Sequence, residues 1–174
     1  KYVPKDHLIV LSFHIPLEDN NSEWFRVADR ERLFNLLKDY PNTLSLSAHT
    51  HIQQQIFYGK DKGWKQGKAH HEYNVGTTSG DWYSGEMNAQ GVPSSTMRDG
   101  TPKGYAMIHF DGNKYKVDYK VAGKSQDYQI NVFAPKEVIK AEKSRHSVYA
   151  NVFMGTPTDE VLFSVNDGEW KKMK

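Results

Sequence analysis

The chain has 174 residues, enough for one domain or for one domain and part of a second. Its 23 Lys and Arg nearly balance its 21 Asp and Glu, which excludes a broad basic field for nucleic acid or an anionic membrane. Absence of cysteine excludes disulfides and thiolate ligands, and no apolar run approaches the ~20 residues of a membrane span. No leader pattern opens the sequence, so we expect any targeting signal to lie outside it.

The first part of the chain predicts an α/β unit. The apolar run Leu8–Leu11 is typical of a strand that is covered on both faces. From about Trp24 to Tyr40, apolar residues recur at three- and four-residue spacing, which predicts a helix. Pro41 is expected to end this helix, because proline disfavours the helical conformation of the residue before it. The stretch Thr43–Ser47 then predicts a second strand.

Histidines follow both predicted strands. His14 comes after the first strand, and His49 and His51 come after the second. Ligands of such sheets collect at the carboxyl ends of strands, and imidazole nitrogen is a common ligand of zinc and iron. The three histidines therefore predict half of a metal site, although three ligands are too few for two metal ions. The alternatives are an ordinary polar pair at a strand end and, for His14 alone, a structural histidine.

Further strands are predicted at Ile52–Tyr58 and Glu72–Val75. The adjacent pair His70-His71 could be read as metal ligands, but neighbouring strand residues point to opposite faces. The stretch Gly76–Asp81 could present backbone N–H groups to a phosphate, and a plain polar turn is the stronger interpretation. The segment Trp82–Pro102 is longer than ordinary connections, and such loops are usually functional or mobile.

The second half of the chain predicts β structure. A hairpin is expected from Tyr105–Phe110 and Lys114–Val121, and the second arm alternates apolar and polar residues as a half-buried strand does. Composition changes at about Gly123, after which three strands are expected at Gln129–Phe133, Val148–Phe153 and Glu160–Val165. A β-sandwich needs about seven strands, so we expect this module to be cut short.

These residues resemble the C-terminal half of the calcineurin-like metallophosphoesterases. Ser12–Pro16 resembles the family's lone-histidine motif, and Ala48–His51 resembles its Gly-His-x-His motif, with alanine where glycine is usual. The stretch from Gly80–Gly85 through Met97–Tyr105, together with Val148–Phe153, is similar to a bacterial subgroup that carries a C-terminal β module.

The resemblance implies an α+β fold with two parts. Residues 1–123 would form the C-terminal portion of a layered α/β/β/α metallophosphoesterase sandwich. Residues 124–174 would begin a β-sandwich module that is truncated. A sheet without its partner strands exposes unpaired edges and apolar surface, so we also expect self-association.

The resemblance also implies a ligand set for two divalent ions, which would be Mn, Fe or Zn. His14 and His49 would bind one ion, and His51 the other. The family's Asp-x-His, Gly-Asp-x-x-Asp and Gly-Asn-His-Asp/Glu motifs are missing, and no catalytic residue is present by motif. We therefore expect a fragment that binds metal weakly or not at all and is inactive by itself.

The function implied by the resemblance is metal-dependent hydrolysis of a phosphomonoester or phosphodiester. Trp82, Tyr83, Arg98 and Asp99 are candidates for contact with substrate, and an equal alternative is that these aromatics pack the β module onto the core. The rival functions are a non-catalytic β-rich docking module and a complete but non-catalytic scaffold. By analogy with the subgroup, the location would be extracytoplasmic, either periplasmic or at the cell surface.

Overall fold

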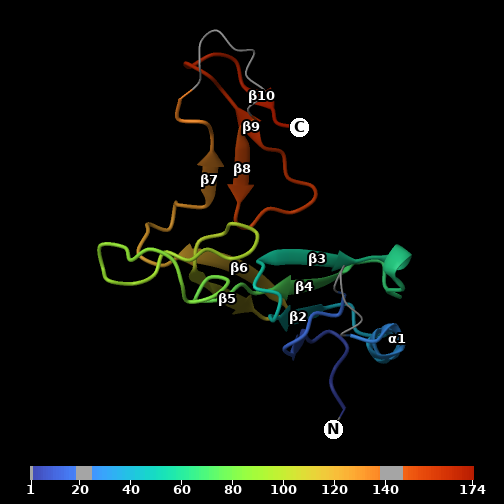
Figure 1. The fold of residues 1–174 in the computed structure, drawn as a ribbon. Coiled ribbons are helices and arrows are strands. Elements are labelled where there is room, and N and C mark those ends of the chain that lie inside the picture. Colours follow the sequence, from blue (N-terminus) through green and yellow to red (C-terminus); the bar gives the residue numbers. More distant parts are fainter. Residues whose placement is uncertain (1, 19–24, 138–146) are drawn as a thin grey trace.

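A mixed four-stranded sheet forms the centre of the protein. The computed structural model describes residues 2–18, 25–137 and 147–174. The strand order is β1-β2-β4-β3, with β1, β2 and β4 parallel and β3 antiparallel to β4 (Figure 1). Their bounds are β1 Ile9–Ser12, β2 Thr43–Ser47, β3 Gln54–Tyr58 and β4 His70–Asn74. The carboxyl ends of β1 and β2 therefore lie side by side.

One α-helix covers one face of this sheet. Helix α1 (Val27–Leu36) buries Phe34 completely, against Tyr58 of β3 and Trp64, which follows the short 3-10 helix η1 (Lys60–Lys62). The helix is shorter than predicted: the chain leaves it in a turn in which the Tyr40 amide donates to the Leu37 carbonyl. The predicted start at residue 24 lies outside the described residues. No helix in the described ranges has the length and hydropathy needed to cross a bilayer.

The predicted hairpin is confirmed. Strands β5 (Gly104–Asp111) and β6 (Lys114–Val121) pair along their full length around Gly112, whose φ of 57° is a left-handed conformation that glycine adopts at little cost. A second buried cluster anchors the hairpin. It contains two side chains from β6, one from the irregular segment before the hairpin and one from the C-terminal region: Met97, Tyr119, Val121 and Phe153.

Two small antiparallel pairs form the C-terminal region, which projects away from the central sheet (Figure 1). Strand β7 (Ile130–Phe133) pairs with β8 (Tyr149–Val152), and β9 (Leu162–Phe163) pairs with β10 (Lys171–Lys172). Strand β9 is shorter than predicted, and β10 was not predicted. The side-chain amides of Gln53 and Gln55 donate to the carbonyls of Phe153 and Met154, which joins this region to the sheet.

The fold differs from the layered sandwich that was expected. The described residues form a mostly β structure with one α-helix, the four-stranded sheet and small antiparallel pairs, and they do not form a layered α/β/β/α sandwich. The reason lies in residues 76–103, which contain only two isolated bridges, Met87–Pro93 and Thr96–Pro102, and so add no further sheet. The C-terminal strands likewise remain separate pairs and do not form a sandwich.

Candidate functional site

His14 and His49 come together at the carboxyl ends of β1 and β2. The parallel register places Ser12 opposite Leu46, and beyond it the Ala48 amide donates to the His14 carbonyl at 3.0 Å. The Nε2 atom of His14 lies 2.8 Å from the Nδ1 atom of His49, and the two rings meet edge to face. Two histidines that are distant in sequence are therefore joined by a hydrogen bond between their ring nitrogens.

The backbone that carries the second histidine motif is unusual. His49 and His51 have φ angles of 70° and 56°, in the left-handed region that non-glycine residues rarely adopt. Between them the Thr50 amide donates to the Ala48 carbonyl at 2.8 Å. Strain of this kind costs about 1–3 kcal/mol per residue and persists only where surrounding contacts hold it. Four non-glycine residues of the described chain have positive φ, and two of them, His49 and His51, were predicted to bind metal.

Asn74, at the end of β4, holds this strained turn. Its side-chain amide donates to the Ala48 carbonyl at 2.6 Å and to the Ser47 hydroxyl at 3.0 Å, and its oxygen accepts from the Thr50 hydroxyl at 2.6 Å. Asn74 is fully buried, so these bonds are shielded from water. One side chain thus fixes the residues on both sides of His49.

Glu72, two residues earlier on the same face of β4, holds the other loop. Its carboxylate accepts the Leu17 amide with both oxygens, at 3.1 and 3.2 Å, and the Tyr58 hydroxyl at 2.6 Å. Burial raises the pKa of the Glu72 carboxyl, and hydrogen bonds from Ser47, Tyr58 and Leu17 act in the opposite direction. Leu17 lies three residues after His14 in the same loop, so Glu72 fixes the path of the loop that carries His14.

His51 points toward the long irregular segment. Its Nδ1 atom lies 3.1 Å from the Oδ1 atom of Asp81, and the Nε atom of Arg98 donates to that same oxygen at 2.8 Å. The Arg98 amide also donates to the His51 carbonyl at 3.0 Å. The ring of Trp82 packs edge to face on His51, with centroids 5.1 Å apart. This segment therefore folds over the second histidine motif.

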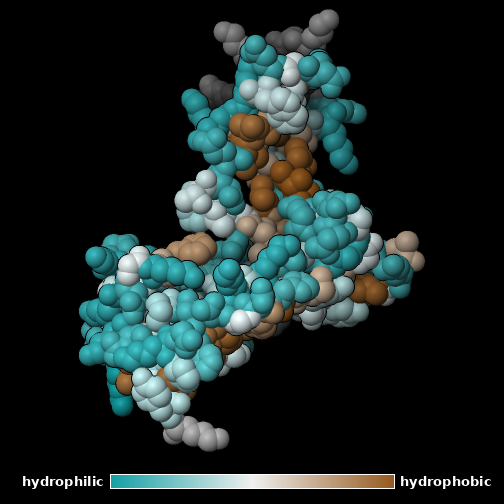
Figure 2. All heavy atoms as spheres, turned by 180° about the vertical axis from the view of Figure 1, so that it is seen from behind, coloured by the Kyte–Doolittle hydropathy of each residue, from teal (hydrophilic) through white to brown (hydrophobic). Residues whose placement is uncertain are grey.

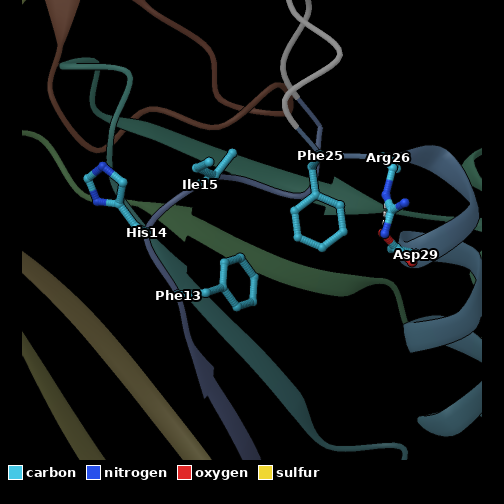
Figure 3. A pocket seen from close by; sticks show the side chains of 6 residues that line it. All are labelled: Phe13, His14, Ile15, Phe25, Arg26 and Asp29. Atoms are coloured by element: carbon cyan, nitrogen blue, oxygen red, sulfur yellow. Dashed lines mark hydrogen bonds and ion pairs between the residues drawn. The ribbon is translucent and has the colours of Figure 1, made fainter.

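A hollow of about 360 Å³ opens beside His14 (Figure 3). His14 and Ile15 lie at one end of it, and the Arg26–Asp29 ion pair at the N-terminus of α1 lies at the other. Phe13 and Phe25 face each other between these ends, with ring centroids 6.2 Å apart. The hollow gives His14 an apolar flank and leaves its ring accessible.

The four predicted substrate residues separate into two groups. Trp82 and Arg98 contact His51 or its partner, as described above. Tyr83 is exposed and carries the Lys103 ammonium over its ring, 5.6 Å from the centroid. Asp99 is turned into its own loop, where it accepts from the Thr101 hydroxyl at 2.7 Å and from the Gln53 amide at 3.4 Å. Asp99 thus has a structural role in the described fold.

His70 and His71 point to opposite faces of β4, as strand geometry predicts. His70 lies under α1, where the hydroxyls of Thr43 and Ser45 bond its two ring nitrogens at 2.8 Å each. His71 lies on the other face, between Phe57 and Tyr115, with its Nδ1 atom 2.8 Å from the Tyr115 hydroxyl. Burial lowers the pKa of each imidazole to about 4. These histidines are parts of the core.

The His14–His49 pair fits one metal ion in its donor type and spacing. Two imidazole nitrogens on one tetrahedral zinc ion lie about 3.3 Å apart, so the observed 2.8 Å requires only a slight opening. Neutral imidazole nitrogens are suitable ligands for Zn, Fe and Mn ions. Among the residues that the structure describes, no group of three or more His, Asp or Glu side chains is arranged to hold a metal. The pair is thus a partial donor set.

Sequence reasoning missed three polar residues that organise the site. Glu72 and Asn74 both lie inside the predicted strand Glu72–Val75, but a strand prediction does not indicate their roles. Their signal was polar side chains at two-residue spacing in a strand that the sheet buries. Asp81 lies in the polar stretch Gly76–Asp81 and in the Gly80–Gly85 part of the family resemblance, and neither predicts its contact with His51.

Comparison with known families shows the family to which the chain belongs. A family described as "C terminal of Calcineurin-like phosphoesterase" matches residues 72–174, which is more than half of the chain. The protein therefore belongs to the calcineurin-like phosphoesterases, in the C-terminal region that this family describes. The match begins at Glu72, so the three histidines precede the matched region. Searches of curated proteins and of solved structures gave no match.

Proposed function

We propose that this chain supplies the histidine part of a metal centre that hydrolyses a phosphomonoester or phosphodiester. The observation that carries the proposal is the 2.8 Å approach of His14 Nε2 and His49 Nδ1 at the carboxyl ends of two parallel strands. The two nitrogens would hold one ion, and His51 would bind a second. The remaining ligands would lie outside the described residues.

The chemistry of the proposed centre follows from its donors. Bound divalent ions would lower the pKa of a water molecule and neutralise charge on the phosphoryl oxygens. The residues of this chain would hold those ions, with Asn74 and Glu72 fixing the two loops that carry the histidines. Arg98, beside His51, would bind the negatively charged phosphate, and Trp82 would contact the remainder of the substrate. An extracytoplasmic location, periplasmic or at the cell surface, completes the proposal by family analogy.

The proposal is tested by metal titration of the purified 174-residue chain. Co²⁺ serves as the probe, because its absorption spectrum reports nitrogen coordination, and Mn²⁺ and Zn²⁺ follow by calorimetry. His14→Ala and His49→Ala should each remove most of the binding. His109→Ala is the matched control, because His109 lies on the β5–β6 hairpin, where its Nε2 atom is 3.5 Å from Asp118. Equal binding by all three variants would refute the proposed ligands.

A second function is favoured by the apolar surface of the C-terminal region. Val132, Tyr149 and Trp170 are exposed by 58%, 65% and 70%, which is unusual for large apolar side chains in one small region. Such a surface would suit a β-rich docking module for another protein. The two functions differ in their response to a chelator. Removal of metal would abolish a hydrolase and would leave docking unchanged.

A further inference from the structure

Asp81 occupies a defined place behind His51. Its Oδ1 atom lies 3.1 Å from His51 Nδ1 and accepts from Arg98 Nε at 2.8 Å. The side chains of His51 and Asp81 are 22% and 31% exposed, so water competes with this contact only in part. The Asp81 amide donates to the Thr96 carbonyl at 2.7 Å, which fixes the backbone under the carboxylate.

We propose that Asp81 is a positioning residue that holds neutral His51 in the Nδ1–H tautomer. An ionised carboxylate can only accept hydrogen bonds, so His51 must donate from Nδ1. A neutral imidazole carries one proton, and Nε2 is therefore left with its lone pair. Metal ions bind the unprotonated nitrogen, so Asp81 presents Nε2 as the ligand atom. That last step rests on the proposed function, whereas the tautomer does not.

Arg98 and Trp82 complete the support of His51. The Arg98 guanidinium can only donate hydrogen bonds. Its bond to Asp81 Oδ1 therefore keeps that oxygen in the position from which it contacts His51 Nδ1. Its backbone amide holds the His51 carbonyl, and thereby the left-handed backbone at that residue. Trp82 restricts the ring from one side. His51 is thus held at its backbone, at Nδ1 and along its ring.

The test is the tautomer of His51 in the full chain without metal. Histidine labelled with nitrogen-15 is observed by NMR at about pH 8, above the ordinary titration range of histidine. The chain as it stands and Asp81→Asn should show a protonated Nδ1, because the asparagine oxygen still accepts and Arg98 still orients it. Asp81→Ala should lose this preference, and its Nε2–H form should become populated. Glu86→Ala is the control, because Glu86 is an exposed carboxylate of the same irregular segment.

The outcomes separate positioning from general structural support. If Asp81→Ala retains the amide spectrum of a folded chain and His51 keeps its tautomer, the proposal is overturned. A protonated Nε2 in the unaltered chain would overturn it as well. Co²⁺ titration adds the functional arm: Asp81→Ala should bind about 10- to 100-fold more weakly, and Asp81→Asn should bind nearly as the unaltered chain does. A tautomer that responds as expected in a chain that binds no Co²⁺ supports the positioning role by itself, because the Nδ1–H tautomer does not depend on a bound metal.

Discussion

The carboxylate of Glu72, in the middle of β4, accepts the backbone amide of Leu17 with both of its oxygens, at 3.1 and 3.2 Å. Leu17 belongs to the loop that carries His14, so a residue of the central sheet fixes the position of a proposed ligand. Asn74 does the same for the turn that carries His49. Two polar side chains on one face of one strand thus organise both halves of the histidine pair.

Replacement of Glu72 should release the His14 loop. Glu72→Ala leaves the Leu17 amide and the Tyr58 hydroxyl buried without their acceptor, and each such loss costs about 1–3 kcal/mol. We expect the free energy of unfolding in urea to fall by about 2–5 kcal/mol. Glu18→Gln is the control, because Glu18 makes only partly exposed ion pairs and should cost under about 1 kcal/mol. Equal losses in the two variants would contradict the role of Glu72.

Replacement of Asn74 should affect the turn around His49. In Asn74→Asp, a carboxylate oxygen replaces the group that donates to the Ala48 carbonyl, so attraction becomes repulsion. We expect a loss of about 2–3 kcal/mol in the free energy of unfolding. Thr50→Ala removes only the hydroxyl that donates to Asn74 and should cost about 1 kcal/mol. If Asn74→Asp proves as mild as Thr50→Ala, the turn does not depend on that amide.

The left-handed conformation of His49 predicts an unusual order of stability. With a φ of 70°, His49 carries strain that alanine retains and glycine relieves. His49→Gly should therefore be more stable than His49→Ala by about 1 kcal/mol, although glycine ordinarily destabilises a fold. Both variants lose the imidazole, so the difference reports the backbone alone. Thermal unfolding of the two variants measures it, and a more stable alanine variant would contradict the conformation.

How far the sequence predicts this site depends on how each residue is held. His14 and His49 could be expected to meet, because each follows a predicted strand and parallel strands bring their carboxyl ends together. The partnership of His51 with Asp81 could not be foreseen. Asp81 lies in an irregular segment whose path depends on distant bonds, such as that from its amide to the Thr96 carbonyl. Side-chain periodicity carries no information about such a path.

The difference between local pattern and contacts of distant segments also explains which parts of the fold were predicted. The first two strands were predicted nearly to the residue: Leu8–Leu11 is a short apolar run, and Thr43–Ser47 alternates leucine with hydroxyl residues, and both patterns are typical of strands. The polar row on β4 departs from that rule: His70, Glu72 and Asn74 are fully buried on one face. Their burial is tolerated because hydroxyls, amides and a tyrosine on neighbouring elements form hydrogen bonds with them. These partners come from other parts of the sequence, so the bonds can be recognised only in the folded sheet. The layered sandwich was inferred from the family resemblance and not from local pattern, and the described residues do not show it.

The buried His70 predicts a loss of stability in acid. Burial lowers its pKa to about 4, against about 6.5 in an unfolded chain. Between these values the unfolded state binds more protons than the folded state, so the free energy of unfolding falls as pH decreases from about 6.5 to about 4. One such histidine accounts for roughly 3 kcal/mol over that range. His71, with the same direction and value, adds to the effect.

Urea titrations at several pH values measure this loss. His70→Gln retains polar atoms near Thr43 and Ser45 but cannot take up a proton, so its stability should decline much less between about pH 6.5 and 4. His109→Gln, at an exposed position on β5, is the control and should retain the full decline. A His70→Gln profile parallel to that of the unaltered chain would place the acid sensitivity elsewhere.

Exposed strand edges and apolar surface predict self-association. Within the described residues, β1 and β3 end the central sheet, and their outer edges can pair with another chain. The projecting C-terminal region also presents hydrophobic side chains at its surface (Figure 2), among them Val132 on β7 and Leu162 on β9. Light scattering should therefore give a mean mass above 20.0 kDa that rises with concentration.

Two variants divide this association between its possible causes. Val132→Lys together with Leu162→Lys places charge on the C-terminal surface, and Val10→Lys places charge on β1, where Val10 is 41% exposed. Each lysine disfavours burial against a second chain, so the variant that lowers the mass identifies the surface in contact. A single mass of 20.0 kDa at every concentration would show that neither the sheet edges nor the apolar surface is sufficient to bring two chains together.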